Sequence, residues 1–365
     1  MVERTPYTPI LKWKKAEEGA IKDLTDTQKD GLLPMFEFIC PTKLSKAAQK
    51  QGINTIDGEL TEYQSITIPQ NILLSWGDGR PFLVDFTLLE PVAIRKEFVS
   101  KFIANSHKLF LQPIPVINAG EYNSDYAASA IAQSIKHLES KICLRFNKAE
   151  LDNINKNLKA LCQKYSLFPG TISVLIDLKE DTDEELFKRA VFALSKIDLI
   201  EEYEHIIIAS GAFPKDMGGI TTENDRRPRA DWANWFNIQG DDEILRYPAF
   251  ADYTIRHPVY DVLAELHIPT ATIKYTLDAE WRFFKGRVGE YRQCLAYASA
   301  FRQDNEFYGR NFSSGDKYID DRGLYFDEYI RNPQKGGTGN AKTWIRAGIN
   351  HHIAVVVDQI ANLPD

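Results

Sequence analysis

Short apolar runs recur along the chain, and each carries a charged residue near its end. The clearest is Ile172–Leu178, which follows a proline-glycine turn signal and precedes an acidic segment typical of a helix start. Three other runs have the same form: Pro34–Phe38, Phe82–Phe86 and Ile142–Phe146. Runs that are apolar on both faces are typical of parallel strands covered by helices. The pattern therefore predicts a buried parallel sheet.

Segments with helical spacing separate these runs. One example is Val92–His107, which places Ile94, Phe98 and Phe102 on one face. Strands that alternate with helices indicate βα units. About eight strands favour a closed (βα)8 TIM-like barrel over an open doubly wound sheet, and no glycine-rich phosphate loop follows the first strand. The predicted fold class is thus α/β.

Seven of the eight strands can be assigned from the pattern. They are Thr8–Lys14, Leu33–Ile39, Phe82–Phe86, Ile114–Asn118, Ile142–Phe146, Ile172–Leu178 and His205–Ser210. The eighth is either Ala251–Arg256 or Thr270–Tyr275, and the pattern does not separate them. Pro115 counts against the fourth strand, because proline removes a ladder donor. Ser65–Ile68 also has the pattern of an extended segment.

The domain prediction follows from these assignments. Residues 1–270 form the (βα)8-like barrel. Residues 271–365 form an irregular C-terminal extension, made of a hairpin, loops and a closing helix packed on the same barrel. We expect a single domain.

Composition narrows the class of protein. An apolar fraction of 44% in 365 residues is ample for a large core, and a formal charge of −7 argues against bulk nucleic-acid binding. No run approaches the ~18 apolar residues that a membrane span needs, and the first thirty residues have no signal-peptide pattern. The four cysteines lack metal-like or redox-like spacing. We therefore expect a cytoplasmic protein without membrane association.

Candidate chemistry collects at the ends of the predicted strands. Barrel enzymes carry their active sites at the carboxyl ends of their strands. Asp177, Glu37 and Asp85 are carboxylates flanked by apolar residues at such ends, and Asp177 is the first candidate for catalysis. Carboxylates can act as general acid and base or hold a cation such as Mg²⁺. The metal itself is unknown from sequence.

Further polar residues at these ends are candidates for substrate binding. Lysine and arginine among them can bind phosphate or carboxylate groups. The candidates are Lys12, Lys14, Arg145, Asn118, Ser210, Tyr253, Arg256, Lys274, Tyr275 and His351. The alternative is structural: Arg145 pairs with a neighbouring carboxylate, and a salt-bridge network plugs the barrel.

Two other features allow two interpretations each. The long loop Phe213–Gly240 contains Arg226–Arg229, then Trp232 and Trp235. It either binds an anionic, stackable ligand or docks its tryptophans on the barrel. His351 either faces the barrel mouth or, like its neighbour His352, is packed and hydrogen-bonded at the barrel edge.

The chain resembles the beta protein family, named for a T-even phage protein and found in phages and mobile elements. The similar residues are Tyr7–Lys14, Ile273–Thr276, Trp281, Gly286, Trp344 and Asn350–Ile353. The resemblance spans nearly the whole chain and implies an association with phages or mobile elements. It supplies no catalytic residues to transfer.

Two functions follow as hypotheses. The first is a barrel that binds a small anionic ligand, such as a nucleotide or another phosphate-containing compound, at its mouth and hydrolyses it by carboxylate or metal chemistry. The second is a non-catalytic protein that binds a phage or host protein, as in anti-phage defence, and uses the barrel as a scaffold. Because one fold supports many functions, the enzyme hypothesis depends on the mouth alone.

Overall fold

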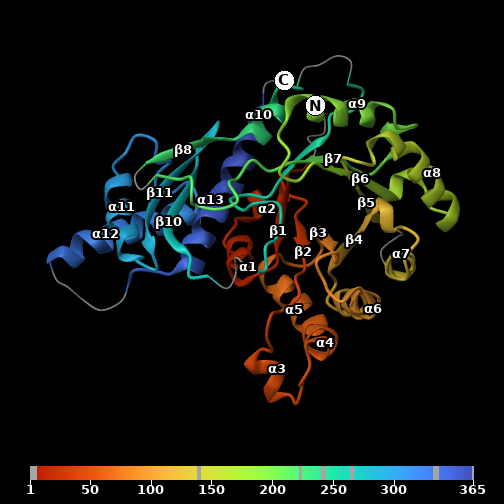
Figure 1. Cartoon of the computed structure of the whole chain (residues 1–365), viewed down its shortest axis with the longest axis horizontal. Helices are drawn as coiled ribbons and strands as arrows, with labels where there is room; N and C mark the ends of the chain where they lie inside the picture. Colours follow the sequence, from red (N-terminus) through yellow and green to blue (C-terminus); the bar gives the residue numbers. More distant parts are fainter. Residues whose placement is uncertain are drawn as a thin grey trace.

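The protein is a closed parallel barrel with a lobe attached to one side (Figure 1). The computed structural model describes residues 6–137, 141–221, 224–239, 244–263, 267–331 and 337–363. The barrel strands, in order around the barrel, are β1 (Thr8–Lys12), β2 (Met35–Glu37), β3 (Pro81–Asp85), β4 (Gln112–Asn118), β5 (Ile142–Asn147), β6 (Ile172–Asp177), β7 (Ile206–Ala209) and β9 (Ala249–Asp252). The predicted TIM-like fold is confirmed.

Helices cover the outside of the barrel. They are α1 (Lys15–Lys22), α2 (Asp26–Asp30), α3 (Lys46–Lys50), α4 (Ile56–Gly58), α5 (Ser65–Ser75), α6 (Val92–Lys108), α7 (Asp125–His137), α8 (Ile154–Tyr165), α9 (Glu184–Ser195) and α10 (Ala230–Phe236). A π-helical turn, Glu59–Gln64, joins α4 to α5. Four phenylalanines pack as an aromatic cluster: Phe98 and Phe102 of α6, with Phe38 and Phe86 directly after β2 and β3.

The eighth strand is β9, the earlier of the two predicted candidates. It pairs with β1 through Thr8 and with β7 through Ala209, which closes the barrel. The later candidate, Thr270–Tyr275, lies in a separate sheet as β10 (Thr270–Thr276). Pro115 does sit in a central strand, opposite Val84 of β3.

Two local predictions were wrong. Ser65–Ile68 is the first turn of α5 and not an extended segment, because Ile68 and Ile72 share the buried face of a helix. The first strand ends at Lys12, so Lys14 is the residue that precedes α1 and does not project from a strand.

The C-terminal extension forms the lobe. Its three-stranded antiparallel sheet has the order β10, β11 (Glu280–Val288), β8 (Asp225–Pro228). Helices α11 (Arg292–Phe301) and α12 (Ser314–Arg331) pack with this sheet (Figure 1). We call β8, β10, β11, α11 and α12 the C-terminal lobe.

The loop expected at Phe213–Gly240 is largely ordered structure, although residues 222, 223 and 240 lie outside the described part of the chain. Arg226 and Arg227 lie on strand β8, where Arg226 pairs with Glu280 and Glu306, and Arg229 directly precedes α10. Trp232 and Trp235 lie on α10, are buried, and pack against Phe250 of β9. The docking interpretation of the tryptophans is therefore the one that the structure supports.

Helix α13 (Ala341–Ala361) connects the lobe to the barrel. It packs against α1 on one side and against β10 and α12 on the other. Arg346 forms an ion pair with Asp23 after α1, and the Asn350 side chain donates to the Ala20 carbonyl at 3.0 Å. The closing helix thus binds both parts of the molecule.

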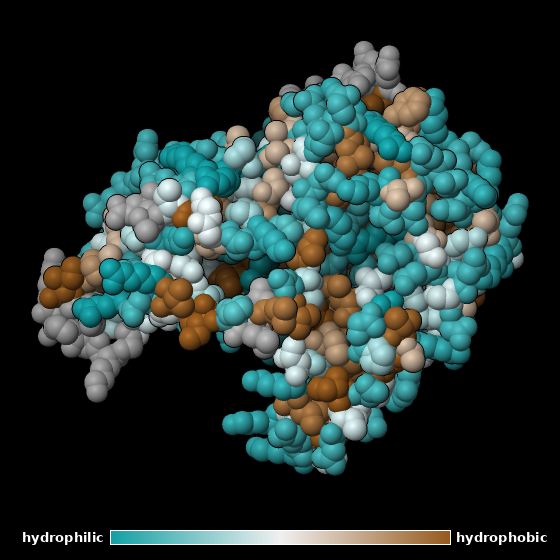
Figure 2. Space-filling view, in the orientation of Figure 1, coloured by the Kyte–Doolittle hydropathy of each residue, from teal (hydrophilic) through white to brown (hydrophobic). Residues whose placement is uncertain are grey.

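One face of the molecule is largely hydrophilic (Figure 2), and the four cysteines form no disulfide. Cys40, Cys143, Cys162 and Cys294 are unpaired. Hydrophilic residues dominate the face in Figure 2. Across the described ranges, no helix combines the length and apolar character that crossing a membrane requires.

Candidate functional site

The alternation of side chains along each strand determines which residues point into the barrel. Successive strand side chains alternate between the two faces of a sheet. Ile10, Met35, Leu83, Cys143 and Leu175 form one apolar layer inside the barrel. The residue two positions further along each strand must point the same way, and it is polar in every case. These residues are Lys12, Glu37, Asp85, Arg145 and Asp177.

Arg145 lies at the centre of this polar layer. Its Nε and Nη2 donate to Asp177 Oδ2 at 3.0 and 2.5 Å. Nη1 and Nη2 each reach Glu37 Oε1 at 3.1 Å, and Nη1 also bonds Asp85. Nη2 also donates a hydrogen bond to the Tyr253 hydroxyl at 2.8 Å. The three predicted catalytic carboxylates therefore do converge, but they converge on a guanidinium group.

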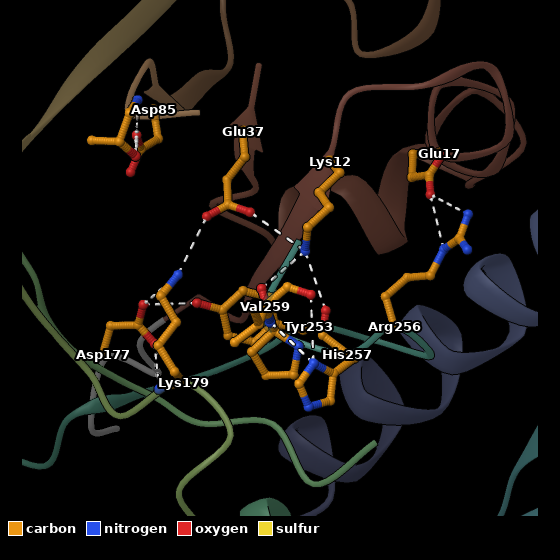
Figure 3. A network of polar contacts seen from close by, with 12 residues as sticks. Lys12, Glu17, Glu37, Asp85, Asp177, Lys179, Tyr253, Arg256, His257 and Val259 are labelled. Carbon is orange, nitrogen blue, oxygen red and sulfur yellow. Dashed lines mark hydrogen bonds and ion pairs between the residues drawn. The ribbon is translucent and has the colours of Figure 1, made fainter. Parts of the chain in front are cut away.

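Two lysines complete the cluster (Figure 3). Lys12 Nζ donates to the carbonyls of His257 and Pro258 at 3.2 and 3.1 Å and lies 3.7 Å from Glu37 Oε2. Lys179 Nζ lies 3.2 Å from Asp177 Oδ2 and 3.8 Å from Glu37 Oε1. We call Lys12, Glu37, Asp85, Arg145, Asp177, Lys179 and Tyr253 the mouth network.

The mouth network balances three carboxylates with three cations in a buried place. Burial alone would raise the pKa of Asp177, but Lys179 and Arg145 outweigh it and hold that pKa well below its usual range. Burial likewise opposes the charge on Arg145, yet Tyr253 and the carboxylates raise its pKa. Both groups stay ionised at neutral pH. Such mutual neutralisation is typical of a structural ion-pair cluster.

The arrangement does not fit the predicted Mg²⁺ site. A guanidinium occupies the point where the carboxylates converge, and Asp85 Oδ1 and Asp177 Oδ1 are bound by the backbone amides of Thr87 and Lys179. No group of three or more potential metal ligands is arranged around a common point in the described ranges of the chain. The acid-base role of these carboxylates stays a prediction, and the geometry favours a structural role.

Three predicted binding residues lie outside the network. Asn118 points the same way as Arg145 but donates to Glu121 at 3.3 Å. Ser210 is buried after β7, and Lys14 lies over the Tyr260 ring. The structure therefore does not bring these three side chains together.

Tyr275 on β10 of the lobe and His351 on α13 contact each other, away from the mouth network. The His351 ring stacks on Tyr275 at 3.8 Å, and its Nδ1 and Nε2 lie 2.8 Å from Asp316 Oδ2 and the Thr276 carbonyl. Tyr275 donates to Asp316 at 2.7 Å. All three side chains are buried. The prediction that His351 faces the barrel mouth is wrong, because its hydrogen bonds hold α13 on β10 and α12.

A second buried chain of hydrogen bonds includes His352, which we expected from the sequence to be packed and hydrogen-bonded at the barrel edge, although its partners were not predicted. Tyr7 donates to Asp252 Oδ1 at 2.5 Å, and His352 Nε2 lies 2.8 Å from Asp252 Oδ2. His352 Nδ1 lies 2.9 Å from the Thr276 hydroxyl. Burial lowers the pKa of His352 against the opposing effect of Asp252. This neutral histidine joins β9 of the barrel to β10 of the lobe and has no open access.

A pocket of about 290 Å³ lies between the barrel and the lobe. Its barrel wall is the chain that follows β7 and β9, so it opens at the carboxyl ends of two barrel strands. The lobe wall comes from β10 and from Tyr291, which directly precedes α11, and helix α13 closes the remaining side. The lining includes Phe213, Lys215, Arg256, Thr270, Lys274, Tyr291 and Trp344. We call it the lobe pocket.

Two predicted binding residues, Arg256 and Lys274, line the lobe pocket. Arg256 donates from Nε and Nη2 to Glu17 at 3.2 and 3.1 Å, which leaves Nη1 without a hydrogen-bond partner in the described segments (Figure 3). Burial, and after it the charge of Arg256, lower the pKa of Lys274 to about 7, against a smaller opposing effect of Glu17.

Sequence reasoning missed Lys179, Glu17 and Lys215. Lys179 directly follows the predicted strand Ile172–Leu178, and a search extended beyond strand ends would have found it. Glu17 and Lys215 lie on a helix and a loop, where nothing in the local pattern distinguishes them from other surface charges.

Eight parallel strands with a polar layer at their carboxyl ends define a TIM-type (βα)8 barrel protein, here with an antiparallel lobe beside the mouth. Residues 7–358 match the family described as Beta protein, so the chain belongs to the Beta protein family. The predicted family is thereby confirmed. No curated protein matches the chain.

Proposed function

We propose that the protein binds a small anionic ligand in the lobe pocket. The observation that carries the proposal is the set of cationic groups in this pocket: Lys215 and Arg256 line it, joined by Lys274 when that amine is protonated, against one lining carboxylate, Asp216. A volume of about 290 Å³ suits a small metabolite better than a nucleotide. The position at strand carboxyl ends is where barrel proteins of many kinds bind ligands.

The pocket supplies more than charge. The Arg256 guanidinium is held by Glu17 and presents its remaining edge, which suits a carboxylate or phosphate oxygen. Thr270 and Thr272 add hydroxyl groups, and Phe213 and Trp344 add apolar walls. Few polar groups between apolar walls are the usual composition of a small-molecule site.

The mouth network supports this proposal as a rigid base. Lys12 bonds the carbonyls of His257 and Pro258, the segment that follows Arg256, so the ion pairs fix one wall of the lobe pocket. Hydrolysis by Glu37, Asp85 and Asp177 stays a prediction. The alternative of a non-catalytic interaction protein, and an association with phages or mobile elements, also stay predictions.

A thermal-shift screen with phosphate, dicarboxylates and 2-oxo acids tests the proposal. We expect at least one anion to raise the melting temperature of the wild type. Lys215→Gln removes an exposed cation from the lobe pocket. It should weaken the binding of that anion by roughly fivefold, which corresponds to about 1 kcal/mol. Lys46→Gln removes an exposed lysine on α3 and should not. Equal effects of the two variants, or no stabilising anion, would refute the proposal.

A further inference from the structure

Lys274 differs from the other cations of the lobe pocket in its surroundings. Its ammonium has no hydrogen-bond or ion-pair partner in the described parts of the chain, and it lies 4.7 Å from the centroid of the Phe213 ring. Arg256 occupies the same pocket. Lys215, in contrast, is exposed to solvent. An apolar wall and a neighbouring cation are the two conditions that keep a lysine amine neutral and nucleophilic.

The backbone holds this amine in a fixed place. Lys274 lies on β10, opposite Phe283 of β11, and its carbonyl is in close contact with Gly348 of α13. Sites on strands are positioned more accurately than sites on loops. The amine therefore projects from a rigid sheet into a pocket that also contains an anion-binding group.

We infer that Lys274 forms a Schiff base with a small carbonyl compound that carries an anionic group, the class of 2-oxo acids and aldehydo acids. This inference rests on the proposed anion site and names its ligand class. Arg256 and Lys215 hold the anionic end. The carbonyl carbon then lies toward the Lys274 amine.

The reaction balances without a further reagent. The neutral Nζ attacks the carbonyl carbon, a C–N bond forms, and the π electron pair moves to oxygen. The carbinolamine then loses water: the oxygen leaves with the two hydrogens that the amine carried, and a C=N bond remains. Tyr291 lines the pocket with a buried hydroxyl that has no hydrogen-bond partner among the residues that the structure describes. Burial raises its pKa, so it stays protonated and can donate to the departing oxygen.

Reductive trapping tests the inference. The protein is incubated at pH 7 with glyoxylate or pyruvate and cyanoborohydride, and the modified lysines are mapped by peptide mass spectrometry. We expect Lys274 to be modified roughly tenfold or more faster than other lysines, since ordinary lysines are almost fully protonated at pH 7. Propanal, which lacks the carboxylate, shares only the preference for a neutral amine, so it should modify Lys274 more slowly and less selectively than glyoxylate does.

The pH profile of the wild type gives a test that needs no variant. Modification of Lys274 should reach half its maximum near pH 7, whereas modification of exposed lysines should still rise above pH 9. Lys274→Arg places a guanidinium where the amine was and should remove the adduct while anions still stabilise the protein. Lys46→Arg, at the exposed lysine of α3 outside the pocket, is the matched control and should keep the adduct on Lys274.

The outcomes separate the two proposals. If anions stabilise the protein but adducts spread over exposed lysines and spare Lys274, the Schiff-base inference is wrong and the anion site stands. If no anion stabilises the protein and Lys274 is spared, both are wrong. Modification of Lys274 by propanal as fast and as selective as modification by glyoxylate would show a reactive amine without the proposed ligand class, which also refutes the inference.

Discussion

Arg145 is the residue on which the barrel mouth depends. Its guanidinium contacts Glu37, Asp85 and Asp177, which come from three different strands. A buried ion pair adds little net stability compared with apolar packing, but removal of one partner leaves an uncompensated charge. Here a single cation serves three carboxylates, so its loss is felt at three strand ends at once.

We predict that Arg145→Met lowers the free energy of unfolding by about 3–5 kcal/mol, because three buried carboxylates keep only Lys12 and Lys179 as partners. Urea denaturation at pH 7 measures this loss. Arg189→Met, which breaks an exposed pair with Asp152, is the control and should change stability little. A loss for Arg145→Met no larger than the control would show that the network does not bear on stability.

A second prediction concerns the pH dependence that Lys274 introduces. Its pKa of about 7 in the folded protein lies below its ordinary value in the unfolded chain, so the folded state binds fewer protons between these two values. The penalty is complete below pH 7 and fades as the pH rises toward 10. Lys274→Met removes it and should stabilise the protein more at pH 6 than at pH 9.

The difference between the two pH values should be on the order of 2 kcal/mol, since each pKa unit is worth about 1.4 kcal/mol. Urea denaturation of wild type and variant at both pH values measures it. Lys215→Met, at an exposed lysine of the same pocket, should give the same small effect at both. A stabilisation by Lys274→Met that does not depend on pH would contradict the low pKa.

At the level of single residues, the sequence predicted which residues lie at the barrel mouth better than it predicted the ion pairs that they form. Their positions as charges at the ends of apolar strands were enough to select Glu37, Asp85, Arg145 and Asp177 as residues of the barrel mouth. Whether Arg145 closes on the carboxylates or leaves them open depends on side-chain directions across three strands, which no local pattern contains. The lobe pocket could not be predicted from sequence for the same reason, because five separate segments of the chain line it.

At the scale of elements, α12 approaches α13 so closely at Gly315 that a glycine is required there. A Cβ at Gly315 would lie 2.1 Å from the Ala347 carbonyl oxygen, and the Gly315 amide donates to Asn350 Oδ1 at 2.8 Å. The obstructing atom belongs to the backbone of α13, so it cannot move aside as the end of a flexible side chain could.

Gly315→Ala should therefore cost about 2 kcal/mol through overpacking and move the first turn of α12 away from α13. Thermal or urea denaturation measures the cost, and hydrogen exchange of α12 amides reports where it falls. Gly219→Ala is the matched control, because a Cβ there meets nothing within 4 Å. Unchanged stability and unchanged exchange in α12 would contradict the close packing.

The elements that sequence failed to predict are those whose stability comes from distant partners. β8 has the sequence Asp-Arg-Arg-Pro, which has no strand character of its own, and it is extended because it pairs with β11. The choice between β9 and β10 as the eighth strand also depended on pairing, since β9 closes the barrel on β1. The other seven strands had enough local pattern to be assigned.

At the scale of the whole molecule, barrel and lobe share one helix. α13 bonds the barrel through Arg346 and Asn350, and His352 reaches Asp252 of β9. The same helix bonds the lobe through His351 and Asp316. Because residues on opposite faces of one helix hold the two parts, neither part can lose α13 without exposing its own core.

We therefore predict that barrel and lobe unfold in one cooperative transition, in agreement with the single domain expected from sequence. Hydrogen exchange by mass spectrometry at increasing urea should give the same midpoint for amides in β5 and in β10. A chain that ends at residue 269 lacks α13 and should not form the barrel, because Ala16, Ala20 and Ile21 of α1 would lose their cover. Separate midpoints for β5 and β10, or a folded truncated barrel, would show that the lobe is an independent unit. In that case the lobe pocket would lie at a movable boundary and could open by relative motion of the two parts.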